Sequence, residues 1–439
     1  MNESVKHAAP VGQHERIIIL DSLRGIAILG ILLMNIPGFA LPAPASYGDL
    51  TVLNEIGTLN EKVWYVIEMT FAGTQRALFS MLFGAGMILF ISGKEKRLEG
   101  LLPAEYYFRR QLWLLVFGLF NAFVLLWFWD ILFLYAICGM IIFSFRRLSP
   151  KALIIAAVVC LAFQTLRDNV DFFREKNSIV RGEMVAKLDT NVQKLTPDQL
   201  ADLSSMSALK EKYSFAAKQK AVEKSIQKIG GDYAALYEYQ SERSYQGEIF
   251  YTYFGLWDVL IFMFLGMAFY KTGIMTGDAP AKTYWLLFIA GIGLGSLLTW
   301  YRLAGIAGMN FDQYEIVKNV PMDTYELART VRSIGIFGAT MLLYKSGVFK
   351  WFFAMMRPVG QMAFTNYLAQ SFLVGLFFYG IGFGMFGKLQ RYEIYYVVAA
   401  TWALEIIWSN IWLRYFRFGP MEWAWRSLTY WEMQPMKKS

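Results

Sequence analysis

The sequence predicts an all-α membrane protein, a polytopic bundle of about ten transmembrane helices with a polar helical insert between the fifth span and the sixth. Hydrophobic residues make up 56% of the 439 residues, and the mean hydropathy of +0.36 is too high for an ordinary soluble domain. The apolar residues form continuous runs instead of the alternating pattern of barrel strands. Helices of roughly 20 residues cross a hydrocarbon core about 30 Å thick, and they satisfy their own backbone there.

Ten apolar runs are predicted as spans. The third and fourth are divided at Trp129 and Asp130, because the apolar stretch is too long for one crossing and these residue types suit an interfacial turn. The fourth, fifth and eighth are short, so they are expected to tilt little or to lie partly inside the bundle. The predicted spans are 17–39, 70–92, 110–128, 131–145, 152–166, 249–270, 283–303, 331–345, 361–381 and 394–413.

Charge in the connections predicts the orientation. Lysine and arginine gather between spans two and three, four and five, eight and nine, and after span ten, whereas the opposite connections are acidic. The positive-inside rule therefore predicts a multi-pass protein of a bacterial-type plasma (inner) membrane with both termini in the cytoplasm. Loops that face anionic lipid account for the net charge of +8. Membrane lipids are therefore expected as partners, and nucleic acid is not.

The first span has a second interpretation. Arg16, the apolar run that follows, and Ala43-Pro44-Ala45 imitate a signal peptide with a small-residue cleavage site. Nine further predicted spans make an uncleaved first span equally natural.

Residues 167–248 interrupt the membrane pattern with interspersed charges. Thr196-Pro197-Asp198-Gln199 predicts a helix start, and Gly230-Gly231 a stop. The insert is expected to be extracytoplasmic, either as a solvated helical hairpin, a cap over a cavity, or a partner-docking element. The predicted regions are a cytoplasmic tail (1–16), N-terminal membrane helices (17–166), the insert (167–248), C-terminal membrane helices (249–413) and a cytoplasmic interfacial tail (414–439).

Polar residues on the first span share one stripe. At about 100° per residue, Arg24 and Asn35 lie within about 60° of Asp21 around the helix. Asp21 and Arg24 are interpreted either as a structural pair or, for Arg24, as a site for an anionic group such as a phosphate. Asn35 is predicted to bind substrate nearer the outer side. In the C-terminal tail, Arg426 is expected to reach acidic lipid or Asp21.

Arg76 and Asp258 are predicted to line one cavity open to the outer side. They lie roughly 9 and 14 Å into their spans at 1.5 Å per residue, too deep for an interfacial position. Glu68, Asp130 and Arg332 are instead expected at the membrane interface.

A third polar group is central. Asn366 and Gln370 are four residues apart on one helix face, and Glu405 lies near the middle of the tenth span. The amides are interpreted as interhelical hydrogen-bond partners or as substrate ligands. An unpaired glutamate at mid-span is expected to be protonated, which implies a cationic partner or a role in proton handling.

Several segments resemble the domain-of-unknown-function family 418, the YeiB-like membrane proteins. They are LDSLRGIAILG at 20–30 with MN at 34–35, FSMLFGAG at 79–86, DVL at 258–260 with LGMA at 265–268, GQMAFTNYLAQS at 360–371 and FGPMEWAWR at 418–426. Within the last segment, Glu422 is predicted to have a structural or pairing role. The resemblance implies a multi-pass membrane protein that has been linked with transport. The opening segment also distantly resembles membrane acyltransferases that modify extracytoplasmic glycans. Those enzymes rely on a histidine, whereas the only histidines of this sequence are His7 and His14 in the N-terminal tail.

Three functions remain open from the sequence. The first is transfer of an acyl-type group to an extracytoplasmic acceptor, with Asp258 or Glu405 as the base and an unknown acyl donor. The second is transport or export of a small anionic solute, and the third is a non-catalytic envelope scaffold. A small-molecule, glycan or lipid substrate is expected. No metal site or cofactor is evident, because Cys138 and Cys160 both fall inside spans and no cysteine–histidine cluster exists.

Overall fold

A computed structural model describes residues 17–188 and 194–438, and these residues are helical with connecting turns. The tail 1–16, with its two histidines, lies outside the described residues. The helices are α1 (Ile18–Ala40), η2 (Ala45–Tyr47), α2 (Leu59–Thr70), α3 (Thr74–Glu95), α4 (Leu102–Phe123), α5 (Leu132–Phe143), α6 (Pro150–Ala186), α7 (Pro197–Lys212), α8 (Phe215–Ile229), α9 (Tyr233–Gln246), η3 (Gly247–Tyr251), α10 (Thr252–Lys271), α11 (Ala281–Gly308), α12 (Gln313–Asn319), α13 (Tyr325–Ser346), α14 (Lys350–Gln361), α15 (Ala363–Phe378), α16 (Ile394–Tyr415) and α17 (Pro420–Tyr430).

The all-α prediction is confirmed, and apolar helices of membrane-spanning length are present. Within the described residues, six helical stretches are long and apolar enough to cross a membrane, and two shorter apolar helices accompany them. The six are Ile18–Ala40, Leu59–Glu95, Pro150–Ala186, Tyr233–Lys271, Ala281–Gly308 and Ile394–Tyr415, and the shorter two are α5 and α15. Each of the ten predicted spans overlaps a helix of the structure, but the number ten stays a prediction.

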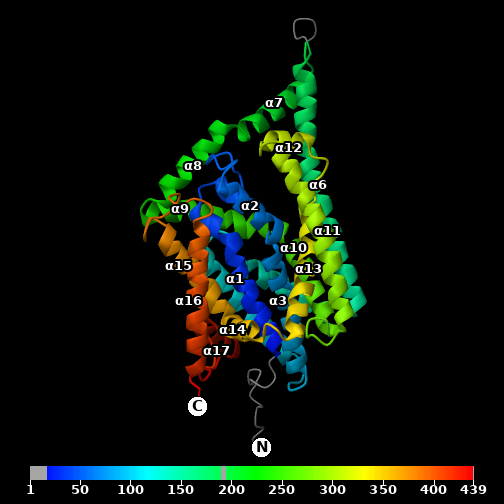
Figure 1. Ribbon diagram of the computed structural model, residues 1–439, viewed down its shortest axis with the longest axis vertical. Coiled ribbons are helices and arrows are strands. Elements are labelled where there is room, and N and C mark those ends of the chain that lie inside the picture. Colours follow the sequence, from blue (N-terminus) through cyan, green and yellow to red (C-terminus); the bar gives the residue numbers. More distant parts are fainter. Residues whose placement is uncertain (1–16, 189–193, 439) are drawn as a thin grey trace, which may run out of the picture.

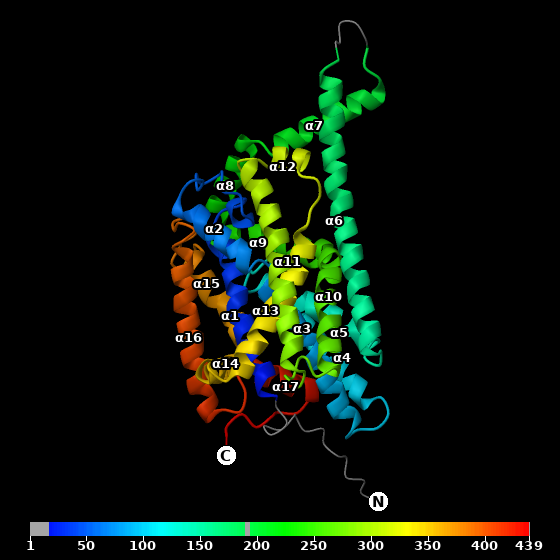
Figure 2. The ribbon, with the colours of Figure 1, turned by 45° about the vertical axis from the view of Figure 1, so that its right-hand side comes forward.

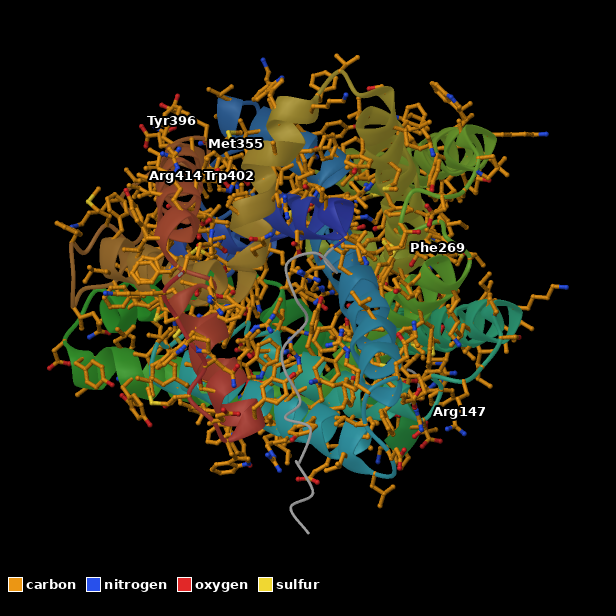
Figure 3. The ribbon with its side chains drawn as sticks, turned by 90° about the horizontal axis from the view of Figure 1, so that it is seen from below. Arg147, Phe269, Met355, Tyr396, Trp402 and Arg414 are labelled. Carbon is orange, nitrogen blue, oxygen red and sulfur yellow. The ribbon has the colours of Figure 1, made fainter. Side chains whose placement is uncertain are left out.

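Both termini lie at one end of the bundle, here called the terminal face (Figure 1). Helices α7, α8 and α9 lie at the other end, the insert face. Seen from the terminal face, Arg147 and Arg414 lie on opposite sides of the bundle (Figure 3). Both side chains are exposed, so basic residues occupy the edge of the face that holds the termini.

Helix α6 is longer than the span predicted for it. It begins at Pro150 behind the capping Ser149, whose hydroxyl accepts from Ala152 N, and runs unbroken for 37 residues. The change from apolar to polar composition near residue 167 therefore falls inside one helix, because nothing there breaks helical geometry. The polar half rises beyond the rest of the bundle (Figure 2).

The insert forms a strap over the insert face. The predicted capping box at Thr196 is confirmed, since Thr196 Oγ1 accepts from Gln199 N at 3.3 Å and Gln199 Oε1 accepts from Thr196 N at 2.9 Å. The helix expected to run on to the glycine pair is divided, because the Ser214 hydroxyl caps a new helix, α8. From the tip of α6, α7 and α8 descend across the bundle to α9 (Figure 1).

Hydrogen bonds attach the strap to the membrane helices, including one from Gln240 Nε2 to Tyr379 Oη at 3.1 Å. Gly380 N donates to Ile229 O at 2.9 Å, and Ser244 Oγ donates to Ala122 O at 2.9 Å. The strap is thus fixed both to the turn after α15 and to the end of α4.

Candidate functional site

Two cavities enter the bundle from opposite faces. The terminal-face cavity has a volume of about 260 Å³, and the insert-face cavity a volume of about 740 Å³. Their linings meet at the first turn of α5, where Leu132 and Tyr135 face the first cavity and Ile131 and Leu134 face the second. Residues of this one helical turn therefore contribute to both linings.

The terminal-face cavity combines apolar walls with arginine side chains. Arg24 Nη1 lies 3.0 Å from Asp21 Oδ1, and Gln361 Nε2 donates to the other oxygen of Asp21 at 3.0 Å. The guanidinium carbon of Arg110 lies 3.6 Å from the centre of the Trp425 ring. With Arg426 also in the lining, three arginines face two carboxylates, so the cavity carries excess positive charge.

The second of those carboxylates, Glu422, accepts hydrogen bonds from the first turn of α15. Its Oε1 accepts from Phe364 N at 2.7 Å and from Thr365 N at 3.1 Å, and its Oε2 accepts from Thr365 Oγ1 at 2.6 Å. A carboxylate at this position satisfies free N–H groups and complements the helix dipole. The first turn of α15 is thereby attached to α17, and the structural or pairing role of Glu422 stays a prediction.

A network of four charged side chains borders the insert-face cavity, and three of them, Arg76, Asp258 and Glu326, line it. Asp258 on α10 forms ion pairs with Arg76 on α3 through one oxygen and with Arg329 on α13 through the other. Arg329 also lies 2.6 Å from Glu326, one turn earlier on its own helix. Arg329 is only 1% exposed, and two cations against two anions leave the network neutral.

Other charged groups of this lining also have partners. Arg167 Nη2 lies 2.9 Å from Asp168 Oδ1. Asp130 accepts from Asn121 Nδ2 at 2.7 Å and from Phe133 N at 2.9 Å, so it caps the first turn of α5. Asp130 is buried, in contrast to the solvated interfacial position expected for it.

Hydroxyl groups close the wall between the cavities. Tyr367 faces the terminal-face cavity, yet its hydroxyl donates to Asp130 Oδ1 at 3.3 Å, in the lining of the other. Tyr135 contacts Ser80 Oγ at 2.6 Å and donates to Arg76 O at 3.1 Å. The wall is therefore thin but internally hydrogen-bonded.

The central group predicted from the sequence lies outside both cavity linings. Asn366 Nδ2 donates to Val359 O and to Ser409 Oγ, each at 3.1 Å, and its oxygen accepts from Trp408. Gln370 Nε2 donates to Glu405 Oε2 at 3.0 Å, and Glu405 is fully buried. These contacts join α15 to α16, and the catalytic and substrate-binding roles predicted for these three residues stay predictions.

The remaining predicted residues divide between the faces. Asp21, Arg24 and Arg426 line the terminal-face cavity, and Asn35, Arg76 and Asp258 line the insert-face cavity. The stripe on α1 therefore reaches one cavity at each end.

Sequence reasoning missed Arg329 and Glu248. The predicted eighth span began at residue 331, but α13 begins at Tyr325 and carries Arg329 inside the protein. Arg332 is also buried. It donates to Met69 O at 3.0 Å and Ala72 O at 2.8 Å, so protein groups surround it in place of the water expected at an interface. An i, i+3 pairing of Glu326 with Arg329 was the signal available in the sequence.

Comparison with known proteins gives a family and several relatives. Residues 269–432 match the family model described as "Protein of unknown function (DUF418)". The chain is 28% identical to "Uncharacterized protein YxaH" of Bacillus subtilis, with 98% of each chain covered. It is also 28% identical to "Uncharacterized protein YeiB" of Escherichia coli, with 94% of this chain and 96% of the relative covered. No solved structure matches.

Proposed function

We propose that this DUF418 protein, a homologue of YeiB, is a membrane enzyme that transfers an acyl-type group from an anionic donor in the terminal-face cavity to an acceptor in the insert-face cavity. The observation that carries this proposal is the pair of cavities with a common thin wall. A donor and an acceptor bound on opposite faces would bring their reacting groups together at the first turn of α5.

The chemistry of the terminal-face cavity suits a donor with a phosphate group and an apolar chain. Arginine presents a planar fork of donors that matches phosphate oxygens, and Arg24, Arg110 and Arg426 supply it. Aromatic and aliphatic side chains such as Phe79 and Leu82 form the adjoining wall. An acyl thioester of a phosphate-bearing carrier, or an acylated phospholipid, has these two parts.

The insert-face cavity suits a polar acceptor. It is the larger of the two, and its lining mixes carboxylates, guanidinium groups and amides, among them Asn35 and Gln75. Such groups form hydrogen bonds with hydroxyl-rich molecules, so a glycan or the headgroup of a glycolipid is the proposed acceptor class.

Transport of a small anionic solute is supported less well. A transporter opens one binding site to one face at a time. Here two cavities with different linings are present together, which fits two bound reactants better than one travelling solute.

The proposed orientation has the terminal face in the cytoplasm, following the basic residues at that end. In intact cells, a cysteine introduced at the exposed Ser204 of α7 is expected to react with a membrane-impermeant maleimide. A cysteine at the exposed Lys96, beside the end of α3, should react only after permeabilisation. Both native cysteines are buried, which keeps the background low. Labelling of residue 96 alone in intact cells would reverse the orientation.

The proposed activity is tested by mass spectrometry of envelope glycans and lipids from deletion and overexpression strains. We expect an acyl modification that disappears on deletion and increases on overexpression. Accumulation of an unmodified anionic solute on one side of the membrane, without any change in acylation, would replace the enzyme with a transporter.

Arg24→Gln is expected to reduce formation of that acyl product by about 10- to 150-fold at limiting donor. The reason is the loss of one hydrogen-bonded charge pair with the donor phosphate, worth about 1.5–3 kcal/mol. Arg147→Gln, at an exposed position outside the cavity lining, is the matched control. Equal activity of the two variants would remove Arg24 from the donor site.

A further inference from the structure

Five carboxylates line the insert-face cavity: Asp130, Asp168, Glu248, Asp258 and Glu326. Four of them are held by ion pairs or hydrogen bonds from neighbouring side chains and backbone. Among the described residues, Glu248 alone of the five has no such partner, and its Oε1 is buried without a hydrogen bond. It is only 4% exposed, so this carboxyl is directed into the cavity from a nearly closed environment.

The backbone around Glu248 is unusual as well. Helices α9 and α10 are joined by a single π-helical turn, η3, which contains Glu248. A π-helical turn is costly and rare, and it occurs frequently at functional sites. The extra residue rotates the following side chains relative to an ideal helix, so the turn decides which side chain faces the cavity.

The nearest cation along the chain, Arg243 on α9, does not neutralise Glu248. The Arg243 guanidinium donates to Gln240 Oε1 at 3.2 Å and to Tyr47 Oη at 3.0 Å, and its carbon lies 3.5 Å above the Phe128 ring. Its donors are thus directed to other groups. A buried carboxyl without a partner is costly, and such a cost at a cavity wall points to a role with a bound molecule.

We propose that Glu248 is the acid–base catalytic residue of the transfer reaction, a role that rests on the proposed function. Its carboxylate oxygen takes the proton from a hydroxyl of the acceptor as that oxygen bonds to the carbonyl carbon of the donor thioester. The carbon–sulfur bond then breaks, and the thiolate leaves into the terminal-face cavity. Glu248 returns its proton to water in the open cavity. One acceptor and one thioester give one ester, one thiolate and one proton.

The other carboxylates are less suitable for this step. Asp258 faces two guanidinium groups, one at each of its oxygens, so neither oxygen is available to a substrate hydroxyl. Glu405 lies outside both cavity linings. Asp130 accepts three hydrogen bonds, from Asn121, Phe133 N and Tyr367. Glu248 therefore takes the role of base that was predicted for Asp258 or Glu405.

The first test compares Glu248→Gln with Glu248→Asp and with the control Glu242→Gln. Glu242 is an exposed glutamate on α9, six residues earlier, so its change removes the same charge outside the cavity. Glu248→Gln is expected to reduce acyl product about 10²- to 10⁴-fold, the usual contribution of general acid–base catalysis. Glu248→Asp should retain part of the activity, and Glu242→Gln all of it. Thermal stability should be unchanged in all three. Full activity of Glu248→Gln would overturn the inference and leave the proposed function in place.

A second test does not depend on activity. Carbodiimides react with the protonated form of a carboxyl group in apolar surroundings, and a base that exchanges its proton with water passes through that form. Purified protein in nanodiscs is therefore treated with dicyclohexylcarbodiimide, and its peptides are analysed by mass spectrometry. We expect adduct on Glu248 and none on Asp258, whose oxygens are both ion-paired. Absence of adduct on Glu248 would contradict a free carboxyl in the cavity. Adduct on Glu248 in a protein without any acyl product would reject the proposed function together with the catalytic role.

Discussion

Replacing Asp258 with asparagine is expected to lower the stability of the folded protein by about 3–5 kcal/mol, the usual cost of removing one member of a buried ion pair. Asp258 neutralises Arg76 and Arg329 at the same time, and Arg329 is 1% exposed. After the substitution, Glu326 alone faces two guanidinium groups. The measurement is the thermal midpoint and the yield of monodisperse protein in detergent. Asp171→Asn, which breaks an exposed ion pair with Arg174 on α6, is the control and should change little.

The apolar double variant Arg76→Met with Asp258→Leu separates stability from function. It removes one cation and one anion, so Arg329 keeps its pair with Glu326 and the network stays neutral. We expect stability near that of the wild type, since apolar side chains of similar volume often replace buried ion pairs without loss. The double variant should form no acyl product, because the insert-face cavity has lost two charged lining residues, Arg76 and Asp258. A stable and fully active double variant would exclude this network from the site.

Gly84→Ala is expected to have the second large effect on stability. An added Cβ at Gly84 would lie 2.1 Å from Met263 O on α10, and one at Gly266 would lie 1.9 Å from Met81 O on α3. Backbone stands in the way at both positions, so the helices would have to separate, at a typical cost of about 1–3 kcal/mol or more.

The control lies on the same helix. An added Cβ at Gly93 meets nothing within 4 Å, so Gly93→Ala should leave the thermal midpoint unchanged or slightly higher because alanine favours the helix. Equal midpoints for the two variants would show that α3 and α10 do not rely on this close contact.

The membrane helices could be predicted because continuous apolar runs leave few alternatives. The turn between α4 and α5 was also predictable, since α4 ends at Phe123 and α5 begins at Leu132 around the expected position. Helix ends were harder to predict. A polar sequence can continue a helix as well as an apolar one, so the sequence of α6 contains no sign of where the membrane ends.

The site was only partly predictable. Arg76 and Asp258 could be found because single charges inside apolar runs stand out. Arg329 was harder to find, because a cluster of charges near Glu326 resembles a loop, and its i, i+3 spacing from Glu326 is a weak signal. Glu248 was predicted to be the last residue of the insert. No sequence pattern predicts the π-helical turn that places it at the cavity.

The thin wall between the cavities has a consequence for the membrane voltage. If both cavities admit water and ions, most of the potential falls across the single turn at Asp130 and Tyr367 instead of across the full thickness of the bilayer. Moving one elementary charge through such a wall involves about 2.3 kcal/mol per 100 mV, whereas a neutral acyl group passes without electrical work. The rate of acyl transfer should therefore not depend on the membrane potential. The rate at which an anion leaks through the same wall should depend on that potential.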